Sequence, residues 1–135
     1  MSHTEVPDIP GAAAVVAWFG YWPTFHDAEV LELHVRRRGT LTLSLHTWRL
    51  SDKRYEEDGK QFIVLEKHAV VTFEMSGKVR VELGGLDNEN VLGCLDVERV
   101  NGTFRFKLWY VEGLVGQIEA PTVRVSIAPG EAKGG

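Results

Sequence analysis

The 135-residue sequence predicts an α+β, mostly β domain in which an N-terminal helix packs on antiparallel strands. From Ala28 onward, several segments alternate apolar and polar residues with a period of two, as half-buried strands do. Helix signals are confined to residues 8–20, and no helical pattern separates the later strands, which disfavours a parallel sheet. We therefore expect one domain, residues 1–135, built as a curved meander or a sandwich of about seven or eight strands.

The helix is predicted over residues 8–20. Asp8 can cap its first turn, Pro10 suits the first helical position, and Gly20 provides a C-terminal stop. Because the segment carries almost no charge, we expect most of it to be buried. Residues 1–7 and 129–135 are expected to be flexible tails.

Two leucine-rich segments predict the first hairpin. Keeping their apolar residues on one face leaves 38–40 as a three-residue loop, with Gly39 as its left-handed residue. The pairs expected in this register are Val35 with Leu43, Leu33 with Leu45, and Glu32 with His46.

The dipeptide Asn101-Gly102 predicts a second hairpin, because both positions tolerate positive φ. A two-residue turn there gives apolar pairs on one face and opposite charges on the other. The expected pairs are Val97 with Phe106, Leu95 with Leu108, Glu98 with Arg105, and Asp96 with Lys107.

The remaining strands are predicted at residues 71–75, 79–83 and 122–127, with Ser76-Gly77 as the turn between the first two. Residues 62–66 extend an earlier strand or form a separate one. Residues 51–61 and 84–90 are predicted as long polar loops, and Gly113 to Gly116 as a turn.

Composition limits the function. A net charge of −4 argues against nucleic acid as a partner. The apolar run 12–19 is too short to span a bilayer, and the N-terminus lacks a signal peptide, so we expect a cytoplasmic protein. Cys94 is the single cysteine and is expected to be a buried, inert thiol. No standard catalytic motif is present, so we expect no cofactor and no enzyme activity.

Residues 22–29 form the segment most suggestive of function. His26, Asp27 and Glu29 together suit a metal, and a histidine beside a carboxylate suits acid–base work. The structural alternative is that Phe25 fills the core while Asp27 bonds backbone amides at the turn into the strand. Adjacent residues of an extended chain point to opposite sides, which favours the structural alternative.

The first hairpin offers a second cluster, because its expected register places Glu32, His34 and His46 on one polar face beside Ser44. Two histidines and a carboxylate suit a transition metal. The alternative is an ordinary solvated face, and without an identifiable third strong ligand we expect no metal site.

A protein-binding surface is predicted on the two polar loops. Trp48 lies near an acidic run that follows Tyr55, and an aromatic residue beside acidic ones is typical of contacts with a basic partner. The alternative is a solvated loop. The expected contact residues are Trp48, Tyr55, Glu56, Glu57, Asp58, Asp87 and Glu89.

One block of residues carries a family resemblance. The order Trp22-Pro23, then Phe25-His26-Asp27-Ala28-Glu29, then Asn90 opening a later strand resembles the immunity protein 50 family of bacterial polymorphic toxin systems. The resemblance implies a protein that binds and neutralises a co-encoded toxin. It supplies no catalytic residues, and its matching positions are fold determinants or toxin contacts. These positions are Trp22, Phe25, His26, Asp27, Glu29 and Asn90.

The sequence therefore predicts a cytoplasmic immunity protein that occludes a toxin with a basic cleft. Two alternatives stay open, namely a small metal- or histidine-dependent enzyme and an oligomerising β scaffold.

Overall fold

The structure, a computed structural model, describes residues 6–37, 39–84, 91–109 and 115–130. Their elements are one helix and eight strands. In chain order these are α1 (Ala12–Phe19), β1 (Glu29–Val35), β2 (Leu41–Glu57), β3 (Lys60–Ser76), β4 (Arg80–Gly84), β5 (Cys94–Val100), β6 (Thr103–Trp109), β7 (Val115–Ala120) and β8 (Thr122–Pro129).

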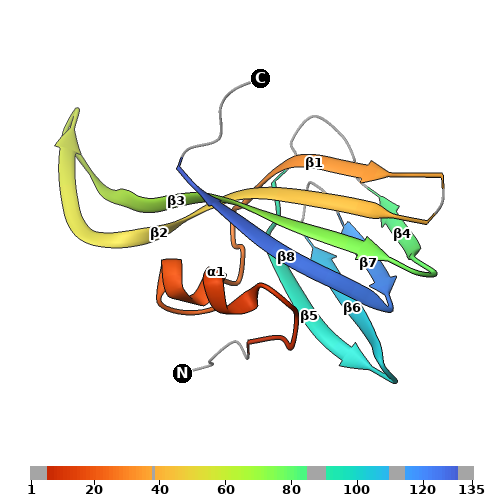
Figure 1. Ribbon diagram of the computed structural model, residues 1–135. Helices are drawn as coiled ribbons and strands as arrows, with labels where there is room; N and C mark the ends of the chain where they lie inside the picture. Colours follow the sequence, from red (N-terminus) through yellow and green to blue (C-terminus); the bar gives the residue numbers. More distant parts are fainter. Residues whose placement is uncertain (1–5, 38, 85–90, 110–114, 131–135) are drawn as a thin grey trace.

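The strands form two four-stranded sheets whose paired strands are all antiparallel (Figure 1). One sheet has the order β1-β2-β3-β8 and the other β4-β7-β6-β5. This confirms the mostly β, α+β class. Because β3 and β4 lie in different sheets and β8 returns beside β3, the chain is a two-sheet arrangement rather than one continuous meander.

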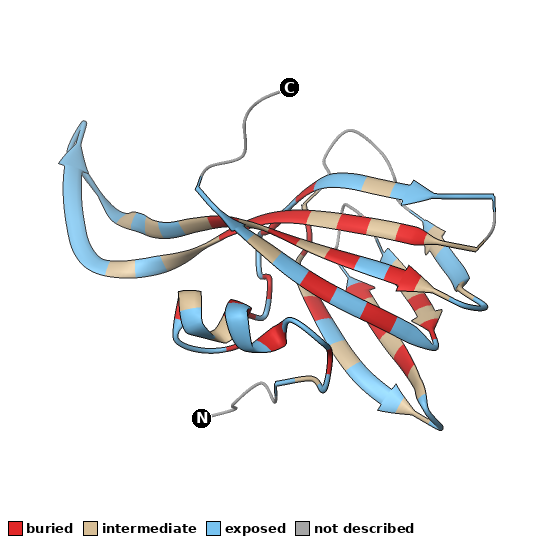
Figure 2. Ribbon diagram, viewed as in Figure 1, coloured by how far each residue is buried: buried red, intermediate tan, exposed pale blue. Residues whose placement is uncertain are grey.

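Both sheets and the helix contribute to one core. Alternate residues of β2, β3, β6 and β8 are buried, as the period-two pattern predicted (Figure 2). At its centre Phe73 of β3 lies edge-on to Phe106 of β6, with ring centroids 5.2 Å apart. Trp22 and Phe25 pack edge-on against Phe73 at 6.1 and 5.8 Å, so the segment before β1 contributes to the same cluster.

Helix α1 is shorter than predicted. It begins at Ala12 because the preceding residues interact with β8: Val125 donates a backbone hydrogen bond to the carbonyl oxygen of Pro10. Gly11 adopts a φ of 96°, and a Cβ there would lie 1.8 Å from the Val125 carbonyl oxygen. Asp8 caps nothing and faces Arg99 at 3.6 Å instead.

The expected burial of most of the helix was also wrong. One face is buried and the other exposes small alanine side chains, which cost little in water. The buried residues are Ala12, Val15 and Phe19.

The register predicted for the first hairpin was wrong by two residues. Leu33 pairs with Leu43 and Val35 with Leu41, and the Arg36 amide donates a hydrogen bond to the Thr40 carbonyl oxygen, so the connection is one residue nearer the N-terminus than predicted. Three-residue loops place their left-handed residue last, and Gly39, with a φ of 77°, occupies that position. A bulge at Leu31 then shifts the pairing again, and Leu31 and Val35 are exposed rather than on the buried face.

The second hairpin matches its predicted register in all four pairs. Asn101 and Gly102 form its turn with φ values of 51° and 80°.

Two predicted loops are strands. Most of residues 51–61 belongs to a hairpin in which β2 continues to Glu57 and β3 starts at Lys60, so residues 62–66 are part of β3. Gly116 lies within β7 rather than in a turn, opposite Leu83 of β4. Its φ is 142°, and a Cβ would lie 1.9 Å from the Glu82 carbonyl oxygen.

Replacing Gly116 with alanine should therefore strongly destabilise the fold, by about 3 kcal/mol or more, because the new methyl group meets rigid backbone. Urea unfolding measures this. Gly84→Ala is the matched control on the neighbouring strand, where nothing lies within 4 Å, and it should change stability by less than about 1 kcal/mol. Equal effects of the two variants would contradict the close approach.

Candidate functional site

The outer half of the β2–β3 hairpin leaves the two-sheet body as an arm, defined here as residues 50–66 (Figure 1). In sheet order β1-β2-β3-β8, β1 pairs with β2 only up to His46, and β8 pairs with β3 only from Ala69 onward. Beyond these points β2 and β3 pair with each other alone. Within the part of the chain that the structure describes, the arm is therefore a two-stranded ribbon without a third strand beside it.

The tip of the arm is a tight turn. Asp58 and Gly59 adopt φ values of 52° and 76°, and Glu57 pairs with Lys60 across them. Two consecutive left-handed residues are typical of a two-residue hairpin turn. Asp-Gly is a strong signal for this turn, so the sequence contained the information that 51–61 is a hairpin.

Irregular pairing bends the arm. The β2–β3 register shifts between Thr47 and Arg49 and again between Leu50 and Arg54, and Lys67 has a φ of 56°. At the second shift the Lys53 amide donates a hydrogen bond to Ser51 Oγ, 3.1 Å away. Bulges turn a strand away from its sheet, which matches the curl of the ribbon in Figure 1.

Large apolar side chains of the arm face solvent. Tyr55 and Phe62 pair across the strands and stack at 5.3 Å with an interplanar angle of 22°. Leu50 pairs with Leu65 nearer the body. The five such residues are each 39–60% exposed, namely Leu50, Tyr55, Phe62, Ile63 and Leu65.

The base of the arm holds a chain of polar side chains. Glu29 Oε1 accepts a hydrogen bond from His46 Nδ1 at 2.7 Å, and His46 Nε2 lies 3.1 Å from His68 Nδ1. A carboxylate only accepts, so Glu29 fixes the Nδ1–H form of His46. The imidazole rings are tilted by only 15°, with centroids 5.2 Å apart, and so meet edge to edge in nearly one plane.

Trp48 covers this polar chain. Its ring centroid lies 5.3 Å from that of His46 and 6.2 Å from that of His68. The side chain is half-buried rather than freely exposed, so Trp48 contributes to the base of the arm. Both ring nitrogens of buried His46 are hydrogen-bonded, and this ties β1 to β2 and β3 at the point where the arm begins.

The 22–29 segment divides into buried and exposed parts. Trp22 and Phe25 lie in the core, as the structural alternative predicted for Phe25. His26 is exposed, and its Nδ1–H donates to the Gly93 carbonyl oxygen at 2.7 Å. Asp27 does not bond backbone amides through its carboxylate, as that alternative expected. Its Oδ2 lies 3.4 Å from His26 Nε2, and its own amide donates to Leu92.

Positive φ angles explain why His26 and Asp27 come together. Phe25 and Asp27 have φ values of 60° and 62°, so the backbone is not extended and neighbouring side chains need not diverge. Glu29 turns away to His46, so the trio His26, Asp27 and Glu29 does not converge. A pocket of about 190 Å³ lies between this segment and residues 47–50 of β2.

The second predicted cluster does not form. With the observed register Glu32 pairs with Ser44 rather than with His46, and His34 pairs with Thr42. Glu32 and His34 lie 3.9 Å apart on an exposed strand. Within the described residues, no group of three or more His, Cys, Asp or Glu side chains is arranged to hold a metal.

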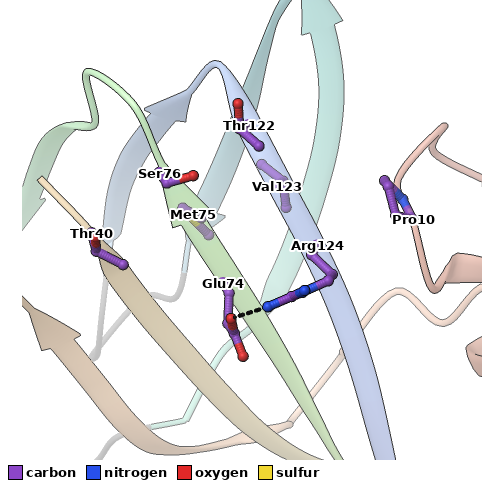
Figure 3. Close-up of a pocket in the computed structure, with 8 residues that line it drawn as sticks. All are labelled: Pro10, Thr40, Glu74, Met75, Ser76, Thr122, Val123 and Arg124. Atoms are coloured by element: carbon purple, nitrogen blue, oxygen red, sulfur yellow. Dashed lines mark hydrogen bonds and ion pairs between the residues drawn. The ribbon is translucent and has the colours of Figure 1, made fainter.

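Another pocket, of about 360 Å³, lies on β3 and β8 near Thr40 and Pro10 (Figure 3). Glu74 and Arg124 form an ion pair of 2.8 Å across it, linking the two strands on their exposed face. The other lining residues are uncharged, which suits a solvated sheet surface; they are Pro10, Thr40, Met75, Ser76, Thr122 and Val123.

Of the predicted contact residues, Tyr55, Glu56, Glu57 and Asp58 lie together at the outer end of the arm and Trp48 at its base. Asp87, Glu89 and Asn90 lie outside the described residues. Sequence reasoning missed the apolar part of the arm, which is Leu50, Phe62, Ile63 and Leu65. It also missed His68, which the register around the Lys67 irregularity brings to His46.

Comparisons with known proteins returned no matching family model, no matching curated protein and no matching solved structure. The described residues include no helix long and apolar enough to cross a membrane.

The Glu29–His46 hydrogen bond should stabilise the base of the arm. Replacing Glu29 with alanine leaves a nitrogen of buried His46 without its acceptor, and we expect a loss of about 1 kcal/mol in urea unfolding. Glu32→Ala is the control, because Glu32 lies on the same strand without bonding His46. The downfield Nδ1–H proton resonance of His46 should disappear in Glu29→Ala alone. Its persistence would contradict the bond.

Cys94 is half-buried, and burial raises the pKa of its thiol, with the Asp96 carboxylate adding to the effect and a backbone hydrogen bond at Leu95 opposing it. The reactive thiolate therefore forms only at higher pH in the folded chain. At about pH 8, alkylation by iodoacetamide should be slower for the folded protein than for the urea-unfolded one. A faster reaction in the folded state would show an activated thiol.

Proposed function

We propose that this protein acts by binding another protein, and that the arm carries the main contact. The observation that supports this is the exposure of five large apolar side chains on a ribbon that leaves the body. Large exposed apolar side chains that gather on one segment are typical of an interaction site. An isolated two-stranded ribbon is marginally stable in water, so a partner that covers it would also stabilise it.

The arrangement of side chains suits a protein partner with a basic cleft. Tyr55 and Phe62 form a stacked aromatic pair, and aromatic residues are enriched at the energetic centres of interfaces. Glu56, Glu57 and Asp58 are exposed at the tip, where they would guide a positively charged surface toward the aromatic pair. A thin ribbon of this kind can enter a cleft that a flat sheet face cannot reach.

The more specific proposal is that the partner is a bacterial toxin and that the protein is a cytoplasmic immunity protein. It rests on the resemblance of Trp22-Pro23 and residues 25–29 to the immunity protein 50 family. Of these positions, Trp22 and Phe25 contribute to the core, which suits fold determinants. The arm then supplies the toxin contact, and inhibition follows from occupying the toxin's cleft.

The experiment co-expresses this chain with the product of the adjacent gene and measures growth and complex formation. We expect rescue of growth and co-purification by the wild-type chain. Tyr55→Ser with Phe62→Ser should weaken the complex at least about tenfold, because both aromatic contacts are removed.

The matched control is Leu31→Ser with Val115→Ser, which replaces two similarly exposed apolar residues on the body. It should leave binding unchanged, and circular dichroism should show that both double variants keep their sheets. Equal binding by the arm variant and the wild type would reject the arm as the contact. A chain that neither rescues growth nor co-purifies would reject the toxin as the partner.

A further inference from the structure

A group of basic side chains lies at the end of the body opposite the arm. Arg36 and Arg37 belong to the β1–β2 connection, and Lys78 and Arg80 follow the end of β3. The two segments touch, because a Cβ on Gly39 would lie 2.9 Å from the Gly77 carbonyl oxygen. We call these four residues the basic end. All four are exposed, and no ion pair involves any of them within the described residues.

This concentration of charge is unusual for the chain. Four of its fifteen lysine and arginine residues form the basic end, and Arg38 follows Arg37 in the sequence, although the net charge is −4. Packing does not require them, because their side chains lie in water and repel one another. Val35 and Val81 add exposed apolar surface close by in sequence. Charges gathered without internal partners suit an acidic partner.

The tip of the arm carries the opposite charge. Glu56, Glu57 and Asp58 are exposed there, with Lys60 as the nearest cation at the turn. The seventeen residues of β2 separate this tip from the basic end, a length of at most roughly 55 Å. Salt screens charges beyond about 8 Å at physiological ionic strength, so the two ends cannot neutralise each other within one molecule.

We propose that the basic end binds the acidic arm of a second copy of this chain. Both surfaces carry the same combination, a cluster of like charges beside exposed apolar residues, with the signs reversed. Because the two surfaces lie at opposite ends, two copies lying antiparallel satisfy both contacts at once, and the pair closes with two-fold symmetry. The Tyr55–Phe62 pair is then covered in the free protein, and the proposed toxin competes with the second copy for the arm.

A second copy fits the basic end better than a nucleic acid does. Nucleic-acid-binding domains usually carry a net positive charge as well as a basic patch, whereas this domain is acidic overall. An acidic arm tip is present on every copy of the chain, with apolar surface beside it.

The experiment is sedimentation equilibrium across a concentration series in about 0.01 M and about 1 M salt, where the screening length falls roughly tenfold. We expect association that is at least about tenfold stronger at low salt. The variants R36E/R37E/K78E and E56K/E57K should each be monomeric, because in each the two ends have the same sign of charge. An equimolar mixture of the two should form a heterodimer, because each reversed end then meets its complement.

Several outcomes would overturn the proposal. A monomeric wild type at low salt, unimpaired association of either variant, or a failure of the mixture to associate would each do so. A monomeric chain that binds duplex DNA through Arg36 and Arg37 would assign the basic end to nucleic acid instead. Toxin binding by the arm is measured separately, so a monomeric chain that still binds its toxin leaves the proposed function intact.

Discussion

The contact between Phe73 and Phe106 is the interaction on which the rest of the structure depends. It joins the two sheets at the centre of the core, and Trp22 and Phe25 complete the cluster from the segment before β1. Because this cluster fixes the inner half of β2 and β3, the outer half can extend into solvent without losing its direction. The arm is thus the exposed outer half of a hairpin whose inner half is fixed in the core.

A single extra residue decides which side chains meet at the base of the arm. The bulge at Leu31 moves the β1 register by one residue, so that Glu29, and not Val30, lies opposite His46. Without that bulge the polar chain from Glu29 through His46 to His68 would not form. The bulge therefore gives Glu29 a structural role that links β1 to the start of the arm, separate from His26 and Asp27.

The sequence predicted local structure well and long-range pairing poorly. Asn101-Gly102 determined every pair of β5 with β6, because turn chemistry and cross-strand charges agree there. Gly39 predicts the first hairpin, but the register depends on where in the loop the left-handed residue stands. The prediction placed Gly39 in the middle of the loop, whereas it is the last loop residue. Nothing local indicates that β8 returns to β3 while β4 joins β7, because sheet order depends on contacts between distant residues.

The candidate site shows the same division. Composition predicts Tyr55 and the acidic residues after it as contacts with a partner. It also predicts a polar loop in this segment, because the many charges obscure the alternation of apolar and polar residues along the two strands. Phe62, Ile63 and Leu65 were not predicted as contacts, because burial is the usual place for such residues. An exposed apolar strand is informative only once it is known that no third strand among the described residues lies beside the arm. That dependence on tertiary structure also explains why the basic end was missed, since Arg36 and Lys78 come together only when β2 and β3 pair.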